Sequence, residues 1–203
     1  MPIVTAIVER RGLMEIAVDG SVALRVRKAH YGKNPLCEGE EIDLDAYTDR
    51  VASTQFADGY EAALSALDYS NRSAKEVAAA LRRRGYVQPC IEAVLARLVD
   101  NRIIDDRRYA ERLAELQSRK PVGVYAFRRK LRAKGISEED AAEALSAFDD
   151  GQQQAAALEA AQKLCRRYAD LPARERRSKL SQALARRGFG WETIESAMDQ
   201  LFD

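Results

Sequence analysis

A basic segment that ends in glycine and an apolar residue occurs three times, and this repeat constrains the fold more than any other feature. The copies are Leu81–Tyr86, Leu131–Ile136 and Leu184–Phe189, with glycines at positions 85, 135 and 188. The intervals of 50 and 53 residues are typical of tandem copies of one supersecondary unit. Stacked units present a surface rather than an enclosed pocket. The sequence therefore favours a binding protein over an enzyme.

Three helices are predicted in each copy, with the glycine directly after the second. In the first copy, Ser73 is a suitable N-cap for the second helix, 74–84, and Glu76 completes a capping box. The helical pattern begins near Asp43-Leu44-Asp45, and the first helix of the repeat is placed at 56–69. Pro89 fits the first turn of the third helix. The matched core positions are Ile91, Ala141 and Ile194, then Leu95, Leu145 and Met198, then Leu98, Phe148 and Leu201. We expect a mainly α protein, an elongated tandem array of three-helix repeats.

Capping residues and helix breakers delimit the other repeats. Asp105 or Asp106 caps the first helix of the second copy, and Pro121 ends it. In the third copy, Pro172 separates the first two helices. The predicted division is a small N-terminal β segment, 1–45, followed by repeats at 46–100, 101–150 and 151–203.

The N-terminal segment contains short stretches rich in valine and isoleucine. These stretches are 3–8, 13–18 and 22–26. Arg11-Gly12 and Asp19-Gly20 separate them, and Asp-Gly between apolar stretches favours a hairpin turn with positive φ at both central residues. We predict a small β-hairpin or three-stranded sheet.

The net charge is only +1, but the charged residues are unevenly distributed. Residues 105–135 contain 10 basic and 4 acidic residues, whereas residues 136–150 contain 6 acidic residues and no basic one. Residues 163–188 contain 9 basic and 2 acidic residues, whereas residues 189–203 contain 4 acidic residues and no basic one. A basic stretch thus leads to each glycine and a neutral or acidic helix follows it. A basic stripe of this kind is typical of proteins that bind a polyanion.

The sequence offers no constellation of residues for catalysis. His30 is the single histidine, which excludes a multi-histidine metal site. Asp105 and Asp106 are better explained by capping of a helix N-terminus than by acid–base chemistry. The sequence also lacks the Gly-x4-Gly-Lys loop that binds nucleotide phosphates. We therefore expect no enzyme activity, no catalytic residue, no metal and no cofactor.

The sequence also lacks membrane and export signals. No apolar stretch approaches the ~18 residues that a membrane span requires, and the first four residues do not resemble a secretory signal. The three cysteines are far apart, as in reduced cytosolic proteins. We expect a cytoplasmic monomer that does not associate with membranes.

Several short motifs together resemble the RecX regulatory protein family. They are Arg72-Ser73 with Glu76, Ile104-Asp105-Asp106 with Tyr109-Ala110, Lys120-Pro121 with Gly123, and Arg187-Gly188-Phe189, within residues 50–203. The resemblance implies a bacterial modulator of the RecA recombinase that binds the RecA filament on single-stranded DNA. It also implies inhibition of the recombinase, ATPase and coprotease activities, and so a role in DNA recombination, DNA repair and the SOS response.

Basic residues near the repeat glycines are the candidates for contact with RecA or with DNA. They are Arg82, Arg83, Arg84, Arg107, Arg108, Lys120, Arg128, Arg129, Lys130, Arg132, Lys134, Arg186 and Arg187. Cations in the last turn of a helix also complement the helix macrodipole, by ~0.3–1 kcal/mol each, without any partner. Helix capping alone therefore remains an alternative for most of them. Arg128, Arg129 and Lys130 lie earlier in their helix and are the better candidates.

Two other classes of protein fit the sequence. A direct DNA-binding protein would use the basic second helix of each repeat, and would bind duplex DNA with a steep salt dependence. An inert helical scaffold would tolerate charge reversal in the central basic cluster. Tyr86, Ile136 and Phe189, which follow the glycines, are expected to seal helix ends rather than to stack on bases.

Overall fold

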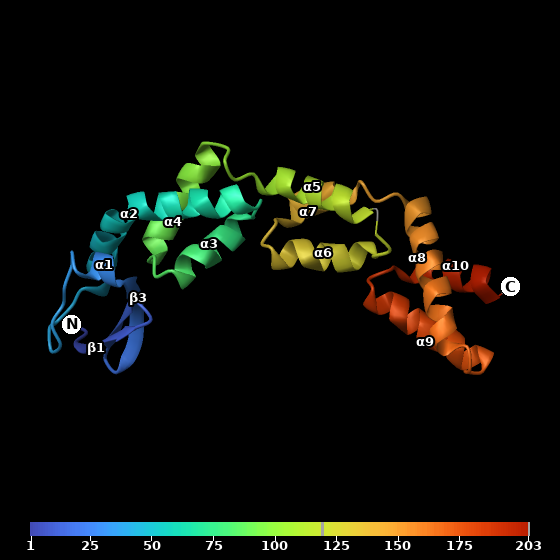
Figure 1. Cartoon of the computed structure of the whole chain (residues 1–203), viewed down its shortest axis with the longest axis horizontal. Helices are drawn as coiled ribbons and strands as arrows, with labels where there is room; N and C mark the ends of the chain where they lie inside the picture. Colours follow the sequence, from blue (N-terminus) through green and yellow to red (C-terminus); the bar gives the residue numbers. More distant parts are fainter. Residues whose placement is uncertain (119, 203) are drawn as a thin grey trace. The chain divides into compact units, whose positions relative to one another are not determined.

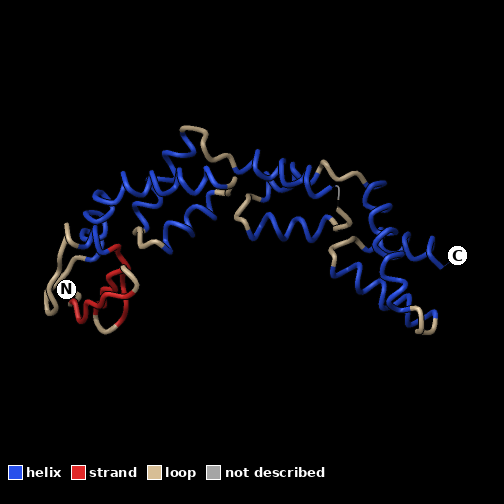
Figure 2. The backbone as a smooth tube through the Cα atoms, viewed as in Figure 1, coloured by secondary structure: helices blue, strands red, loops and turns tan. Residues whose placement is uncertain are grey.

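The computed structural model describes residues 1–118 and 120–202 (Figure 1). As predicted, the chain is mainly helical and begins with a three-stranded antiparallel sheet (Figure 2). It forms two compact units that divide after Asp105. The first contains β1 (Val4–Arg10), β2 (Leu13–Val18), β3 (Ser21–Arg27), α1 (Lys28–Tyr31), α2 (Leu44–Tyr69), α3 (Ala74–Arg83) and α4 (Gln88–Asp100). The second contains α5 (Asp106–Ser118), α6 (Val124–Ala133), α7 (Glu138–Leu145), α8 (Asp150–Cys165), the 3-10 helix η1 (Arg166–Tyr168), α9 (Ala173–Arg186) and α10 (Trp191–Phe202).

The sheet is a meander with the order β1-β2-β3. Asp19 and Gly20 in its second turn have φ values of +49° and +81°, which confirms the predicted hairpin geometry. Val4, Ile16 and Val26 are fully buried and belong to the same hydrophobic core as the first helical repeat. The sheet is therefore an integral part of the first unit.

The start of α2 at Leu44 confirms the predicted start of the helical pattern near residues 43–45. The helix continues without a break through the range 56–69 predicted for the first helix of the repeat, and the Asp43 side chain accepts a hydrogen bond from the N–H of Ala46 at 3.0 Å. The turns before residue 56 form because Tyr47 and Val51 are buried in the core shared with the sheet. The predicted capping box of α3 and the proline in the first turn of α4 are both confirmed.

Gly85, directly after the C-cap of α3, joins the first repeat to the sheet. Its φ is +81°, and its carbonyl accepts hydrogen bonds from the N–H of Arg27 (3.3 Å) and from Nε2 of Gln55 (2.9 Å). Oε1 of Gln55 accepts from the N–H of Val87 at 2.8 Å. A Cβ at residue 85 would lie 2.5 Å from Cδ2 of Leu13 in β2. The glycine is required both by its backbone conformation and by the close approach of the sheet.

Gly188 makes the corresponding joint between the second and third repeats. Its φ is +84°, and its carbonyl accepts a hydrogen bond from the N–H of Tyr125 at 3.0 Å. The carbonyl of Arg187 accepts a second one from the N–H of Gly123 at 3.0 Å. A Cβ on Gly188 would lie 2.2 Å from the backbone nitrogen of Ala126. The start of α6 is thus bonded to the end of α9 through the main chain.

The repeats bury the core positions that the sequence predicted. Seven of the nine matched positions are buried, and the other two, Leu95 and Leu201, pack against the cores from partly exposed positions. In the second repeat, the rings of Phe127 and Phe148 lie 5.2 Å apart. Each repeat therefore has its own hydrophobic core, and the second and third repeats are joined at Gly188.

Gly85→Ala is expected to destabilise the first unit more than Gly20→Ala. Both glycines have a φ of +81°, so each substitution carries a similar backbone cost of ~1–2 kcal/mol. A Cβ at residue 20 meets no atom within 4 Å, whereas one at residue 85 meets Leu13 and the Arg27 nitrogen. Crowding adds ~1–3 kcal/mol at residue 85. Denaturant unfolding measures the difference, and equal losses would contradict a packed joint.

Candidate partner-binding surface

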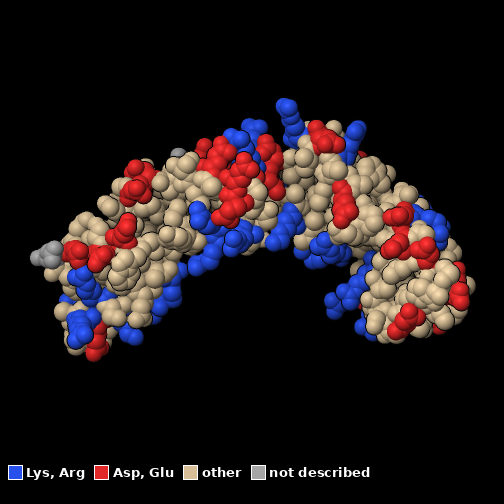
Figure 3. Space-filling model, turned by 180° about the vertical axis from the view of Figure 1, so that it is seen from behind, with Lys and Arg blue, Asp and Glu red and all other residues tan. Residues whose placement is uncertain are grey.

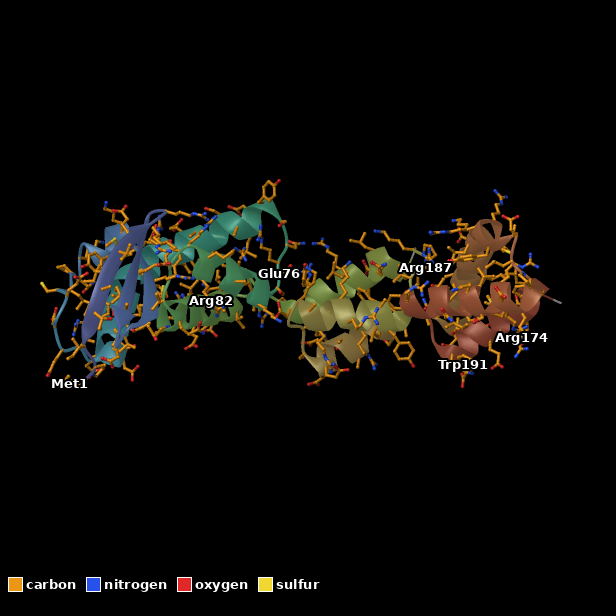
Figure 4. All side chains as sticks on the ribbon, turned by 90° about the horizontal axis from the view of Figure 1, so that it is seen from below. Met1, Glu76, Arg82, Arg174, Arg187 and Trp191 are labelled. Carbon is orange, nitrogen blue, oxygen red and sulfur yellow. The ribbon has the colours of Figure 1, made fainter. Side chains whose placement is uncertain are left out.

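Several of the predicted contact residues lie at the exposed C-terminal ends of the second helices. α3, α6 and α9 each end in a basic turn just before the repeat glycine. In Figure 4, Glu76 and Arg82 lie toward opposite ends of α3, and Arg187 lies at the end of α9. In the second unit, Lys and Arg side chains gather over α6, and many Asp and Glu side chains lie over α5 and α7 (Figure 3). The charge segregation predicted from the sequence is therefore present on that unit's surface.

The three arginines at the end of α3 differ in their side-chain contacts. Nη2 of Arg82 donates to Oε1 of Gln88 at 2.8 Å. Nη1 of Arg84 donates to the backbone carbonyl of Ala62 in α2 at 3.3 Å. Arg83 is exposed and has no side-chain partner among the residues that the structure describes. Because these contacts are to neutral oxygen atoms, they do not compensate the positive charge of the arginines at the end of α3.

A cleft of about 410 Å³ lies between α2 and α3 and is lined by arginine. Its lining residues are Ser65, Ala66, Tyr69, Arg72, Ala80, Arg83 and Arg84. A second cleft, of about 790 Å³, shares Ser65, Arg83 and Arg84 with the first and extends to Arg11 in the β1–β2 turn and to Arg27 of β3. Guanidinium groups and hydroxyl groups together suit an anion such as a phosphate or a carboxylate.

Asp58, which lines the second cleft, ties the sheet to the helices. It accepts a hydrogen bond from the hydroxyl of Tyr86 at 2.7 Å, lies 3.0 Å from Nε2 of His30 and forms an ion pair with Arg27. The Tyr86 hydrogen bond lowers the pKa of Asp58, and His30 and Arg27 act in the same direction. Burial, aided by the bond to Asp58, raises the pKa of Tyr86 to about 12. These contacts give the cluster a structural role at the joint.

α6 carries the basic cluster that the sequence favoured most as an interface. Nε of Arg128 lies 3.7 Å from Glu138, and Nη2 of Arg132 lies 3.6 Å from the same carboxylate. Both arginines are exposed, so these ion pairs contribute only ~0–1 kcal/mol. Arg129 is exposed and has no side-chain partner among the described residues. These side chains are thus free to exchange their weak internal contacts for a partner.

Other candidates are more firmly engaged within the second unit. Nζ of Lys134 donates to the hydroxyl of Tyr109 at 2.9 Å and lies 5.2 Å from the centre of that ring. Arg107 pairs with Glu111 at 3.3 Å and also with Glu143. The hydrogen bond to Glu111, with the charge of Glu143, raises the pKa of Arg107. These two cations stabilise helix contacts and are less available to a partner.

The remaining candidates are exposed. Arg108 lies on α5 and interacts with another residue of the chain. Nζ of Lys130 donates to a buried glutamine of α5 at 3.4 Å. Lys120, Arg186 and Arg187 are exposed, and their side chains have no partner among the described residues. The candidates therefore lie in separate exposed groups along several helices rather than in one enclosed site.

Two aromatic residues next to the repeat glycines are buried, whereas two aromatic residues elsewhere in the chain are exposed. Tyr86 and Phe189 are only 2% and 4% exposed, so they seal helix ends as predicted. By contrast, Tyr69 is 88% and Trp191 is 72% exposed, and the sequence analysis did not single out either. In the sequence, Arg72 stands out only as part of a family motif, although its position just before the N-cap Ser73 places it near the start of α3.

The chemistry available on these surfaces is that of cations, hydroxyl groups and exposed aromatic rings. The described residues contain no cluster of three or more His, Cys, Asp or Glu side chains that could hold a metal ion. No helix in the described part of the chain is long and apolar enough to cross a membrane.

Cationic helix ends on three-helix repeats are typical of a protein that acts through its surface rather than through an enclosed pocket. Comparison with known families narrows this class. Models of the first, second and third three-helix domains of RecX match residues 60–98, 105–145 and 150–198, in that order. The chain belongs to the RecX regulatory protein family, as its motifs indicated.

Individual relatives match most of the chain. "Regulatory protein RecX" of Bacillus subtilis (strain 168) is 31% identical over 210 residues, which cover 99% of this chain and 78% of the relative. The Chlorobium phaeobacteroides (strain BS1) protein of the same description is 36% identical over 155 residues, 75% of this chain and 99% of the relative. The structure is also similar to a "Crystal structure of regulatory protein RecX", with a TM-score of 0.69 and 29% identity over 98% of this chain and 100% of that one.

Asp58→Asn is expected to destabilise the first unit at neutral pH and to have little effect in acid. The contacts lower the pKa of Asp58 in the folded state. Its stabilising contribution is therefore complete above the unfolded value, about 4, and is lost as the pH falls through the lowered pKa. Denaturant unfolding of both proteins at a series of pH values measures this. A stability difference that does not change with pH would contradict a role for the carboxylate charge.

Proposed function

We propose that this protein binds the RecA filament on single-stranded DNA and inhibits its recombinase, ATPase and coprotease activities. The observation that carries the proposal is the match of all three RecX domain models in order along the chain. The exposed cations at the ends of α3, α6 and α9 supply complementary charge for acidic protein surface or for DNA in the filament.

Repetition suits a regulator that contacts a polymer. With repeats at 46–100, 101–150 and 151–203 after a β segment at 1–45, one chain offers several separate contact surfaces. When several weak contacts lie on one chain, the later ones form at a high effective concentration and overall affinity rises. We propose that a cytoplasmic monomer acts in this way on successive parts of a filament.

The direct test is ATP hydrolysis by the cognate RecA on single-stranded DNA, titrated with this protein. Inhibition is expected at far less than one copy per RecA protomer, because one bound chain would affect several protomers. The protein alone must leave DNA and nucleotide intact. If hydrolysis is unaffected even at one copy per protomer, the proposed function is wrong.

Direct DNA binding is a second candidate function. It is favoured by the arginine-lined cleft between α2 and α3, which has no carboxylate among its lining residues. A DNA-binding protein that does not engage RecA would bind DNA equally well in the absence of the recombinase, with a steep salt dependence.

Replacing Arg128 and Arg129 together by Glu is expected to weaken filament binding by about tenfold or more, through like-charge repulsion. Thermal unfolding should be nearly unchanged, because the Arg128 ion pair is exposed and Arg129 has no described side-chain partner. Binding can be followed by fluorescence anisotropy of a labelled chain added to preformed filaments.

A matched control is available in the same unit. Arg166 and Arg167 are adjacent and exposed, and their side chains have no partner among the described residues. Replacing both by Glu changes the net charge by the same amount and should weaken binding much less. If the two double variants lose affinity equally, only net charge matters, and α6 is not the interface.

A further inference from the structure

We infer that the cleft between α2 and α3 is a binding site for single-stranded nucleic acid, which takes a backbone phosphate on Arg72, Arg83 and Arg84 and a base on Tyr69. The three arginines and Tyr69 line the same cleft of about 410 Å³. The inference adds a specific ligand site to the proposed function, and the role of that site in the cell rests on the proposed function. It assigns these side chains to the nucleic acid rather than to the protein of the filament.

Two of the three guanidinium groups are already oriented. Nε of Arg72 donates to the carbonyl of Ala66 at 3.1 Å, and Nη1 of Arg84 donates to the carbonyl of Ala62 at 3.3 Å. Both carbonyls belong to α2, so one helix fixes both arginines while their other N–H groups remain without a described partner. A ligand therefore meets donors whose side-chain freedom is already reduced, which lowers the entropic cost of binding.

The positive charge in this cleft is not compensated. No lining residue is acidic, and Arg72, Arg83 and Arg84 form no ion pair with any described residue. Asp58 and Glu61 line the adjacent, larger cleft, but Asp58 is paired with Arg27. Like charges that line one cleft repel one another, and a bound anion relieves this repulsion. Guanidinium groups match the oxygen geometry of a phosphate and can bind it through paired hydrogen bonds.

The aromatic ring at the cleft favours a single strand over an acidic protein segment or a duplex. Tyr69 is the last residue of α2 and is 88% exposed, which leaves its ring faces open. An exposed aromatic beside cations is the combination with which proteins hold unpaired bases and their phosphates. Bases of a duplex are stacked on each other and cannot use such a ring. The hydroxyl of Ser65 provides a further donor on the same wall.

The test uses the full chain alone, without RecA, and a short fluorescent oligothymidine followed by anisotropy over a salt series. Arg83→Gln with Arg84→Gln is expected to weaken binding by about tenfold and to reduce the slope of log affinity against log salt by about one to two. Tyr69→Ala should weaken binding about fivefold or more, whereas Tyr69→Phe should keep it, because the ring and not the hydroxyl contacts the base.

Lys33→Gln with Arg97→Gln is the matched control. Both residues are exposed in the same unit and line neither cleft. Their replacement removes the same amount of positive charge as the Arg83 and Arg84 substitutions. Arg84 also contacts α2, so each variant is checked by thermal unfolding. If the double variant is unstable, Arg83→Gln alone serves, because Arg83 has no described side-chain partner.

Each outcome supports or overturns the inference independently of the proposed function. Loss of oligothymidine binding in the cleft variants, with the control close to wild type, supports it. Unchanged binding in the cleft variants overturns it, and so does a defect seen only with RecA filaments, which would mean that the cleft takes acidic side chains of the protein. Inhibition of RecA by the wild-type chain is measured in a separate assay. If that inhibition is present while the cleft variants bind DNA normally, only the present inference fails.

Discussion

In each unit, a main-chain hydrogen bond from an earlier element to a repeat glycine joins two modules. The carbonyl of Gly85 accepts the N–H of Arg27 from the sheet, and the carbonyl of Gly188 accepts the N–H of Tyr125 from the second repeat. Both glycines have positive φ, which turns the chain directly after a helix. Because the added Cβ would meet neighbouring atoms at both sites, the same residue that ends the helix also permits the contact between modules.

This arrangement also explains where the charge lies. Since main-chain groups form the joints at Gly85 and Gly188, the charged side chains of the preceding helical turns are not required for them. Cations there complement the helix macrodipole, and most of those in α3 and α6 form only weak or no ion pairs with described residues. Helix capping and partner binding are therefore compatible explanations for the same arginines. Arg107 and Lys134 differ, because each is engaged by a neighbouring helix.

The fold was largely predictable because its signals are local. Ser73 and Glu76 specified the start of α3, Asp19 and Gly20 specified a turn, and apolar residues at fixed distances from each glycine specified the cores. The second role of Gly85 was not predictable in this way, because it depends on contact with the distant sheet. The same holds for the cleft, since Arg72 and Tyr69 acquire a shared role only when α2 and α3 pack together.

The central claim is that the basic ends of the second helices face the RecA filament. Arginine-directed chemical modification, read by mass spectrometry with and without preformed filaments, tests it most directly. The account predicts protection of arginines in α3, α6 and α9, with Arg97 on α4 still reactive. Equal reactivity of all arginines in the presence of saturating filament would contradict it, as would protection confined to Arg97.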